Sequence, residues 1–229
     1  DNMELFENNP NIDGVVPYCG GYTKFFSTIR ELRRYSFDLA LIFHGNEPQA
    51  TAMCYLAGAR FIFKLPNTSK FKFLLSNQTP AAGWDELGHG ISARLKIAEL
   101  AGSSPDGVRM GLFIDKKEEK ATDDFLKKEG IGKDDILIGF QPGASTLSRQ
   151  WFPERFKELG KRLLKKYPDA RILLTGSLSE KRFCDDIAEG MNGMAIVSAG
   201  RVSLKGLAAL IKRLKILVTG DTGPMHIAI

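Results

Sequence analysis

The second half of the chain alternates strand-sized apolar runs with longer segments whose apolar side chains recur at helical spacing. The apolar runs occupy residues 136–140, 171–175, 195–197 and 215–219. Between the first two runs, apolar residues recur every three or four positions from Phe152 to Tyr167, as on one face of a helix. Strands alternating with helices predict a parallel, doubly wound sheet. Because ligands bind at the carboxyl ends of such strands, we expect the loops after residues 140, 175 and 219 to share a site.

The first half shows the same alternation less regularly. Its predicted helices are residues 25–35, 48–57 and 90–100, and its predicted strands are residues 37–43 and 60–63. Residues 64–82 are predicted to form an irregular loop, and the highly charged residues 115–130 a solvated helix at a domain boundary. With 229 residues, the chain is long enough for two domains. We therefore predict an α/β protein with domains at residues 1–133 and 134–229.

Composition argues against several classes of protein. Hydrophobic residues make up 43% of the chain and charged residues 26%, close to the globular average, so a packed core is expected. No apolar run approaches the roughly 20 residues of a membrane-spanning helix. The three cysteines are far apart and the chain has three histidines, which argues against a zinc site or a disulfide framework. Reduced thiols in a cytoplasmic protein are expected instead.

The net charge of +5 lies wholly in the second half of the sequence. Residues 134–229 contain 15 Lys and Arg against 10 Asp and Glu, whereas the preceding residues are balanced. Such an excess fits an anionic ligand or a basic surface, and it is compatible with peripheral attraction to anionic lipid. No dense Lys/Arg run interleaved with aromatic residues occurs, which argues against nucleic acid as a partner.

Common ligand fingerprints are absent from the sequence. It contains no GxGxxG after a strand, no GxxxxGK[ST], no GxSxG and no Asp-x-Asp of the kind that holds a divalent metal on a sugar nucleotide. An anionic ligand would therefore be held mostly by backbone amides and cationic side chains.

The loop after the first strand of the second half offers such groups. Gly143 and Ala144 permit close approach of the backbone, and Ser145 supplies a hydroxyl donor. Arg149 lies just before the helix that Pro153 begins, where its guanidinium could grip a phosphate through two hydrogen bonds. The alternative is an ordinary surface loop with a solvated arginine.

A second loop, at residues 220–226, leads from a strand into a helix N-terminus, which favours an anion. Asp221 would either cap that helix or accept a sugar hydroxyl. His226 could reach the same ligand, or serve only in packing. Glu180 is either a first-turn acid favoured by the helix dipole or an acceptor for ribose hydroxyls. Ser179 and Ser203 are predicted to cap the helices that follow them.

These loops, taken in order, resemble glycosyltransferase family 9, the ADP-heptose:lipopolysaccharide heptosyltransferases. The similar segments of the second half are residues 139–145 (GFQPGAS), 149–153 (RQWFP) and 220–228 (GDTGPMHIA). Those of the first half are residues 7–13 (ENNPNID), 35–42 (YSFDLALI) and 44–46 (HGN). The resemblance covers nearly the whole chain. It implies a GT-B fold, in which two Rossmann-like doubly wound domains face a cleft, with both domains expected to be incomplete here.

The resemblance also implies an activity, namely inverting, metal-independent transfer of heptose from ADP-heptose to a lipopolysaccharide inner-core sugar, with no cofactor. Its donor-binding positions correspond to Ser145, Arg149, Glu180, Val202, Asp221, Thr222, Gly223 and His226. Ser145 and Arg149 match residues that hold the diphosphate, Glu180 an adenosine-side contact, and Val202 a position lining the nucleotide pocket. The family often has Lys at position 149 and a hydroxyl at position 144, where this chain has Arg and Ala.

The acceptor side is less well defined by the sequence. His44 and Asn46 are predicted to lie near the acceptor. Four basic residues in and beside the loop 64–82 could meet lipid-core phosphates, but we expect them to be solvated, namely Arg60, Lys64, Lys70 and Lys72. The family's catalytic base is an Asp in a Gly-Asp loop, which is expected upstream of Asp1. The acceptor implies a cytoplasmic protein, with attachment to the inner membrane as an option. The alternatives are a GT-B enzyme that uses a UDP-sugar and a non-catalytic paralogue that binds a nucleotide or glycan.

Overall fold

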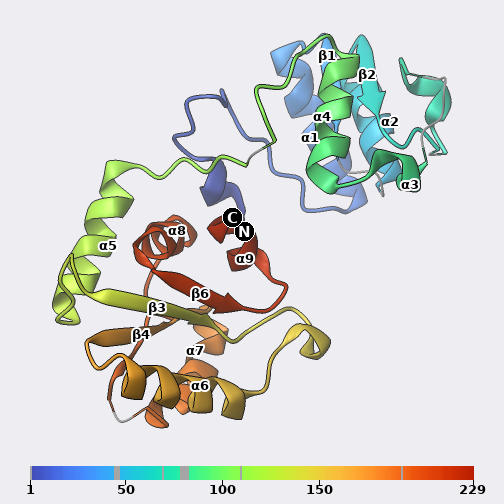
Figure 1. Ribbon diagram of the computed structural model, residues 1–229. Coiled ribbons are helices and arrows are strands. Elements are labelled where there is room, and N and C mark those ends of the chain that lie inside the picture. Colours follow the sequence, from blue (N-terminus) through green and yellow to red (C-terminus); the bar gives the residue numbers. More distant parts are fainter. Residues whose placement is uncertain (1, 44–46, 69, 78–82, 109, 192) are drawn as a thin grey trace. The chain divides into compact units, whose positions relative to one another are not determined.

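The computed structural model describes residues 2–43, 47–68, 70–77, 83–108, 110–191 and 193–229 (Figure 1). It divides the chain into two compact units. The larger unit contains residues 1–12 and 112–229, and the smaller unit contains residues 13–111. This division differs from the predicted domains 1–133 and 134–229, because two further segments pack into the larger unit.

The larger unit is built on a four-stranded parallel sheet. Its strands are β3 (Ile136–Gln141), β4 (Ala170–Leu174), β5 (Ala195–Val197) and β6 (Ile216–Thr219), in the order β5-β4-β3-β6. The chain thus adds β4 and β5 on one side of β3 and then returns to place β6 on the other side. This reversal puts a topological switch point between β3 and β6, the position at which open α/β sheets bind ligands.

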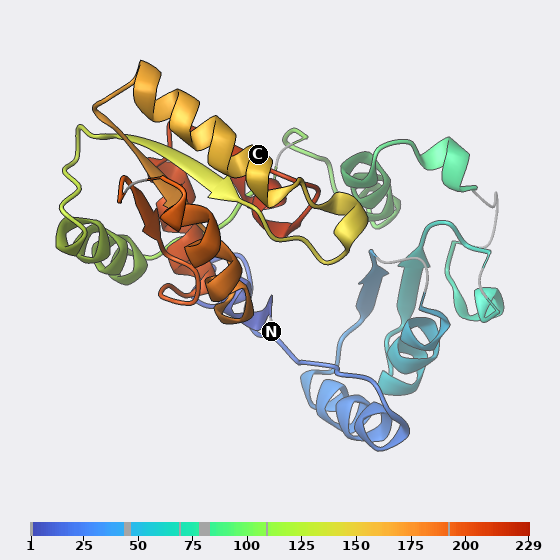
Figure 2. The same cartoon turned by 90° about the horizontal axis from the view of Figure 1, so that it is seen from below.

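Helices cover both faces of this sheet (Figures 1 and 2). Those on one face are α6 (Pro153–Lys166) and α7 (Lys181–Glu189), and those on the other are α5 (Lys116–Lys128) and α8 (Leu204–Arg213). Alternate side chains of the strands point to opposite faces. On β3, Ile138 and Phe140 join the core under α6 and α7, whereas Leu137 joins the core under α5 and α8.

Aromatic packing anchors α6 on the sheet. The ring of Phe156 lies 5.4 Å from that of Phe140 and 5.1 Å from that of Trp151, measured between centroids. Phe156 is 1% exposed, and Cys184 of α7 lies in the same core with no exposed surface. Burial raises the pKa of the Cys184 thiol to about 12, so this cysteine is a core residue and not a nucleophile.

The charged helix α5 differs from the solvated boundary helix that its composition predicts. Leu126 is 2% exposed in the core under α8, and the hydroxyl of Thr122 donates to the carbonyl of Gly206 at 3.3 Å. The N-terminal 3₁₀ helix, Asn2–Phe6, also packs on α8. Its Glu4 carboxylate accepts a hydrogen bond of 2.8 Å from the backbone N–H of Lys205. These contacts assign both segments to the larger unit.

Three helix N-termini test the predicted caps. Ser203 caps α8 as predicted, accepting a hydrogen bond from the N–H of Gly206 at 2.9 Å. The prediction for Ser179 is wrong, because the turn that leads into α7 is capped by Ser177. Asp221 does not cap α9 (Gly223–Ala228), whose N-cap residue is Thr222.

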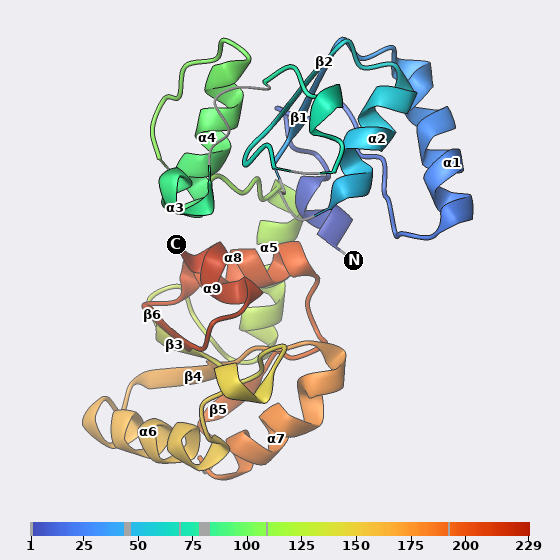
Figure 3. The same cartoon turned by 90° about the vertical axis from the view of Figure 1, so that its right-hand side faces the viewer.

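The smaller unit contains two parallel strands, β1 (Leu39–Ile42) and β2 (Phe61–Lys64). Figure 3 shows α4 on one side of these strands and α1 and α2 on the other. Its helices are α1 (Tyr22–Leu32), α2 (Pro48–Ala57), α3 (Trp84–Leu87) and α4 (Gly90–Leu100), and its 3₁₀ helices are Arg33–Tyr35 and Lys72–Leu74. The core includes Ile42, Ile62 and Leu75.

In the described part of the predicted loop 64–82, hydrogen bonds tie residue 77 to residue 64. The side chain of Asn77 makes two hydrogen bonds with the backbone of Lys64, at 3.0 and 2.7 Å. Lys64 is fully buried, which corrects its predicted solvation, and burial lowers the pKa of its ammonium group. The predicted exposure of Arg60, Lys70 and Lys72 is confirmed.

Across the described ranges, none of the helices combines the length and the apolar character that crossing a bilayer requires.

We expect Phe156→Ala to lower the free energy of unfolding of the larger unit by about 3–5 kcal/mol, because it leaves a cavity between Phe140 and Trp151. Phe152→Ala, four residues earlier and 72% exposed, is the matched control and should change stability little. Urea denaturation followed by tryptophan fluorescence measures both. Equal losses for the two variants would contradict the assigned core.

Candidate functional site

A cavity of about 480 Å³ opens at the carboxyl edge of the larger sheet. The loops after β3, β4, β5 and β6 all contribute to it. The residues that line it are Glu4, Gln141, Ala144, Ser145, Gly176, Ser177, Glu180, Ser198, Val202, Ser203, Leu204, Leu207, Thr222 and Pro224. Four predicted site residues therefore meet at one cavity, namely Ser145, Glu180, Val202 and Thr222. They come from four different loops, as the carboxyl-edge rule for parallel sheets requires.

Glu180 is held in a fixed position on the wall of this cavity. Its Oε2 accepts hydrogen bonds from the backbone N–H of Ser177 at 2.7 Å and from the hydroxyl of Ser177 at 2.8 Å. Its Oε1 lies against Gly143, where a Cβ atom would overlap it. A side chain at position 143 would therefore displace the Glu180 carboxylate from this position. This position is compatible with a first-turn acid that the helix dipole favours. It is also compatible with an acceptor for ribose hydroxyls, because Oε1 has no hydrogen-bond donor among the described residues.

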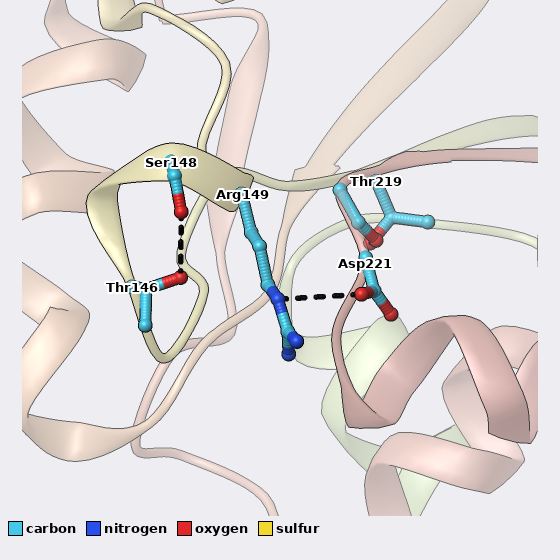
Figure 4. Close-up of polar contacts among 6 residues, drawn as sticks. Thr146, Ser148, Arg149, Thr219 and Asp221 are labelled. Atoms are coloured by element: carbon cyan, nitrogen blue, oxygen red, sulfur yellow. Dashed lines mark hydrogen bonds and ion pairs between the residues drawn. The ribbon is translucent and has the colours of Figure 1, made fainter.

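Arg149 and Asp221 form an ion pair across the switch point (Figure 4). The Nε of Arg149 lies 3.3 Å from the Oδ2 of Asp221, and the side chains are 52% and 58% exposed. A pair this exposed contributes about 0–1 kcal/mol, so the guanidinium can exchange its carboxylate partner for another anion at little cost. Asp221 thus pairs with Arg149 and does not cap α9, whose N-cap residue is Thr222, while its contact with a sugar hydroxyl stays a prediction.

Close backbone packing brings the two loops of this ion pair together. A Cβ atom on Gly220 would collide with the carbonyl oxygen of Arg149. Gly220 precedes Asp221 directly, so the absence of a side chain at position 220 allows the loops after β3 and β6 to touch. Gly223, three residues later, has open space around the position of its missing Cβ.

The remaining predicted residues are less closely grouped. Gly223 is the first residue of α9, and its neighbours Thr222 and Pro224 line the cavity. His226 is exposed and is not among the lining residues, so the structure does not place it at the cavity. The predicted acceptor-side residues His44 and Asn46 lie outside the described residues.

The polar lining residues that sequence reasoning missed include Glu4, Ser177 and Ser198. Ser177 could have been found, because Ser-x-x-Glu at residues 177–180 is the signature of a capping box, and both of its reciprocal hydrogen bonds are present. Glu4 carries no such local signal, since it reaches the cavity through a contact with Lys205, 201 residues away.

The charges of the lining residues are acidic rather than basic. Glu4 and Glu180 are the two ionisable side chains among the described residues of the cavity wall, and both are hydrogen-bond acceptors when ionised. The cavity therefore suits a neutral ligand portion rich in hydroxyl or amino groups. An attached anion would lie toward the hydroxyl of Ser145, which lines the cavity, and toward Arg149, which is not among the lining residues. Among the residues described here, no three His, Cys, Asp or Glu side chains are grouped as metal ligands.

Comparison with known proteins assigns this chain to a family. The profile of glycosyltransferase family 9 (heptosyltransferase) matches residues 25–229. The chain belongs to glycosyltransferase family 9. The family resemblance inferred from the loops at residues 139–153 and 220–228 is thereby confirmed.

Solved structures agree on the fold. A family 9 glycosyl transferase from Veillonella parvula superposes with a TM-score of 0.84 at 24% identity, over 99% of this chain and 66% of that one. E. coli ADP-heptose lps heptosyltransferase II superposes with a TM-score of 0.76 at 20% identity, over 99% of this chain and 69% of that one. E. coli heptosyltransferase WaaC with ADP-2-deoxy-2-fluoro heptose superposes with a TM-score of 0.65 at 18% identity, over 90% of this chain and 62% of that one. The two-unit α/β architecture of family 9 is thus shared.

This family 9 chain spans between 62% and 69% of the length of these three structures. Among curated proteins, no sequence matches it.

We expect Gly220→Ala to lower the free energy of unfolding by roughly 1–3 kcal/mol, because its Cβ would force the backbone of Arg149 away. Gly223→Ala provides the matched control, since its Cβ meets open space and φ is not positive there. Chemical denaturation of both variants measures the difference. A Gly220→Ala protein as stable as Gly223→Ala would contradict the packing of the two loops.

Proposed function

We propose that this family 9 protein transfers heptose from ADP-heptose to a lipopolysaccharide inner-core sugar, with inversion and without a metal ion. The observation that carries the proposal is the carboxylate-lined cavity at the β3/β6 edge with the Arg149–Asp221 pair beside it. The family supports a sugar transferase. Two of the similar structures, a heptosyltransferase that carries a fluorinated ADP-heptose and an ADP-heptose heptosyltransferase, support the choice of donor.

In this proposal the nucleoside of the donor enters the cavity. Glu180 would accept hydrogen bonds from ribose hydroxyls through Oε1, since Oε2 is engaged by Ser177. Val202 would contact the base. The diphosphate would lie toward the Ser145 side of the cavity, where the hydroxyl of Ser145 and the guanidinium of Arg149 would bind it. Asp221 would give up Arg149 to the phosphate and become free to accept a hydrogen bond from a sugar hydroxyl.

The chemical step follows from where charge develops. An acceptor hydroxyl oxygen attacks the anomeric carbon from the face opposite ADP, its proton passes to a carboxylate base, and the bond from the anomeric carbon to the diphosphate oxygen breaks. The family resemblance implies an Asp upstream of Asp1 as this base. The departing ADP gains negative charge, which Arg149 and Ser145 would stabilise as fixed hydrogen-bond donors. Thr222 and Gly223 would add backbone contacts on the donor side.

The acceptor side of the proposal is assigned to the smaller unit. An apolar groove of about 500 Å³ lies between α1, α2 and Phe71, and its lining includes Tyr18, Tyr22 and Phe26. Lys70 and Lys72 flank Phe71 and are exposed, as is Lys24 on α1, whereas Glu47 is the exposed acid beside Pro48. Aromatic and basic side chains together suit an anionic lipid interface. A lipid-linked acceptor would place the protein in the cytoplasm, at the inner face of the inner membrane.

We expect wild-type protein to bind ADP-heptose and ADP more tightly than UDP in a calorimetric titration without added metal. Arg149→Ala should weaken ADP binding roughly 10- to 100-fold, because it removes a hydrogen bond to a charged group, and Arg149→Lys should retain part of the affinity. Arg155→Ala is the control, since Arg155 is a similarly exposed arginine that pairs with Glu158 on α6.

Each result of this titration decides between functions. Preference for UDP would replace the proposed donor by a UDP-sugar within the same fold. Donor binding without transfer to any heptose-acceptor sugar would indicate a non-catalytic binding protein. Unchanged ADP affinity in Arg149→Ala would remove Arg149 from the phosphate site.

We also expect the protein to cosediment with vesicles containing phosphatidylglycerol and not with vesicles of phosphatidylcholine alone. Phe26→Ser and the double variant Lys70→Glu/Lys72→Glu should each weaken this binding several-fold, since aromatic burial and charge both contribute. Phe152→Ser, an exposed aromatic of the larger unit, serves as control. Equal binding by all of these variants would rule out the groove as the lipid-facing surface.

A further inference from the structure

The cavity at the β3/β6 edge has two chemically different walls. One wall is polar and comes from the loops after β3 and β4, with Ser145, Ser177 and Glu180. The other is apolar and comes from the start of α8 and the residue before its cap, with Val202, Leu204 and Leu207. A nucleoside has the matching halves, because its ribose carries hydroxyls and its base presents apolar faces. Under the proposed function, the base would therefore lie against the α8 wall.

Glu4 is the one ionisable side chain on that apolar wall among the described lining residues. Its Oε1 accepts the backbone N–H of Lys205 at 2.8 Å, in the first turn of α8. The same lysine is 2% exposed, and its ammonium group donates to the carbonyl oxygen of Glu7. The segment that carries Glu4 is thus fastened to α8 at two points, which fixes the position of the Glu4 carboxylate at the cavity.

The start of α8 is already satisfied by acidic groups. Ser203 caps the helix by accepting the N–H of Gly206, and its hydroxyl donates to Glu118 at 2.9 Å. Glu4 accepts the N–H of Lys205 in the same turn. A phosphate would meet two carboxylates there, so this end of the cavity repels the diphosphate. Under the proposed function the phosphates lie near Arg149 instead, which directs the base toward Glu4.

We infer that Glu4 is a specificity-determining residue that selects nucleotides whose base carries an exocyclic amino group. One carboxylate oxygen is engaged by Lys205, and the second is an acceptor that can receive an amino N–H from the edge of the base. A donor in the base satisfies this acceptor, whereas a base without one leaves a desolvated carboxylate oxygen unpaired. Sites that hydrogen-bond a ligand group reject the analogue that lacks it. This inference rests on the proposed function, and it adds a residue that the family resemblance does not assign.

The test compares two probes, ADP and purine riboside 5′-diphosphate, which differs from ADP in lacking the 6-amino group. Calorimetric titration of the wild-type protein should give about tenfold or greater preference for ADP. Glu4→Gln keeps an oxygen for the N–H of Lys205 and turns an amide NH₂ toward the cavity, so a donor replaces the acceptor. We expect this variant to bind the two probes with nearly equal affinity, mainly because ADP binds less tightly.

Glu7→Gln is the matched control, since Glu7 lies on the same segment, its side chain is exposed, and only its backbone contacts Lys205. It should retain the wild-type preference. A thermal melt of Glu4→Gln should match that of the wild-type protein, because the hydrogen bond to Lys205 is kept.

The outcomes separate this inference from the proposed function. If wild-type protein binds ADP but Glu4→Gln keeps the wild-type preference, or loses affinity for both probes equally, Glu4 does not select the base and only the inference fails. If wild-type protein does not bind ADP at all, the inference and the proposed donor fail together.

Discussion

The larger unit depends on the reversal of strand order at β3. Because β6 returns to pair with the side of β3 that β4 leaves open, the loops after β3 and β6 emerge next to each other. The contacts between these two loops in the candidate site follow from this adjacency. Gly220 can touch the backbone of Arg149, Asp221 can pair with its guanidinium, and Thr222 can reach the cavity wall that Ser145 also lines. A sheet with β6 beside β5 would separate these residues by the width of three strands.

Negative and positive side chains occupy different parts of this site, so they suit different parts of a ligand. The cavity wall is acidic, and Arg149, the proposed phosphate ligand, is in a solvent-exposed ion pair and is not among the lining residues. The basic excess of residues 134–229 therefore does not accumulate inside the cavity, although it was the sequence's main indication of an anionic ligand. The net charge of a domain indicates whether it attracts anions. Which part of a ligand contacts a positive or a negative side chain is decided by the individual residues of the site.

The secondary structure was largely predictable from the sequence. Periodicity located the helices Pro48–Ala57 and Gly90–Leu100 and the strand Ala195–Val197 at the bounds that the structure gives. Such signals are local, since each depends on residues within a few turns of one another. The grouping of Ser145, Glu180, Val202 and Thr222 was also foreseeable, because the family motifs and the carboxyl-edge rule both point to those loops.

What could not be predicted depends on contacts between distant segments or on competition between neighbours. The burial of Leu126 arises from α8, far along the chain, and the burial of Lys64 from packing that a charged side chain gives no reason to expect. Ser177 replaces Ser179 as a cap because Glu180 completes a reciprocal pair with it. Asp221 does not cap α9 because the helix begins at Gly223, which makes Thr222 the N-cap residue and leaves the Asp221 carboxylate to pair with Arg149.

The contact between Glu4 and Lys205 also bears on how this protein assembles. It closes a loop of 201 residues, and the whole smaller unit is inserted within that loop. Closure entropy rises only with the logarithm of loop length, so such a contact costs about 2 kcal/mol more to close than one across a tenth of the distance. During synthesis, the segment that carries Glu4 leaves the ribosome long before α8 does. The acidic wall of the candidate pocket is therefore completed only after residues 204–213 have been made, so this part of the site forms after translation of the smaller unit.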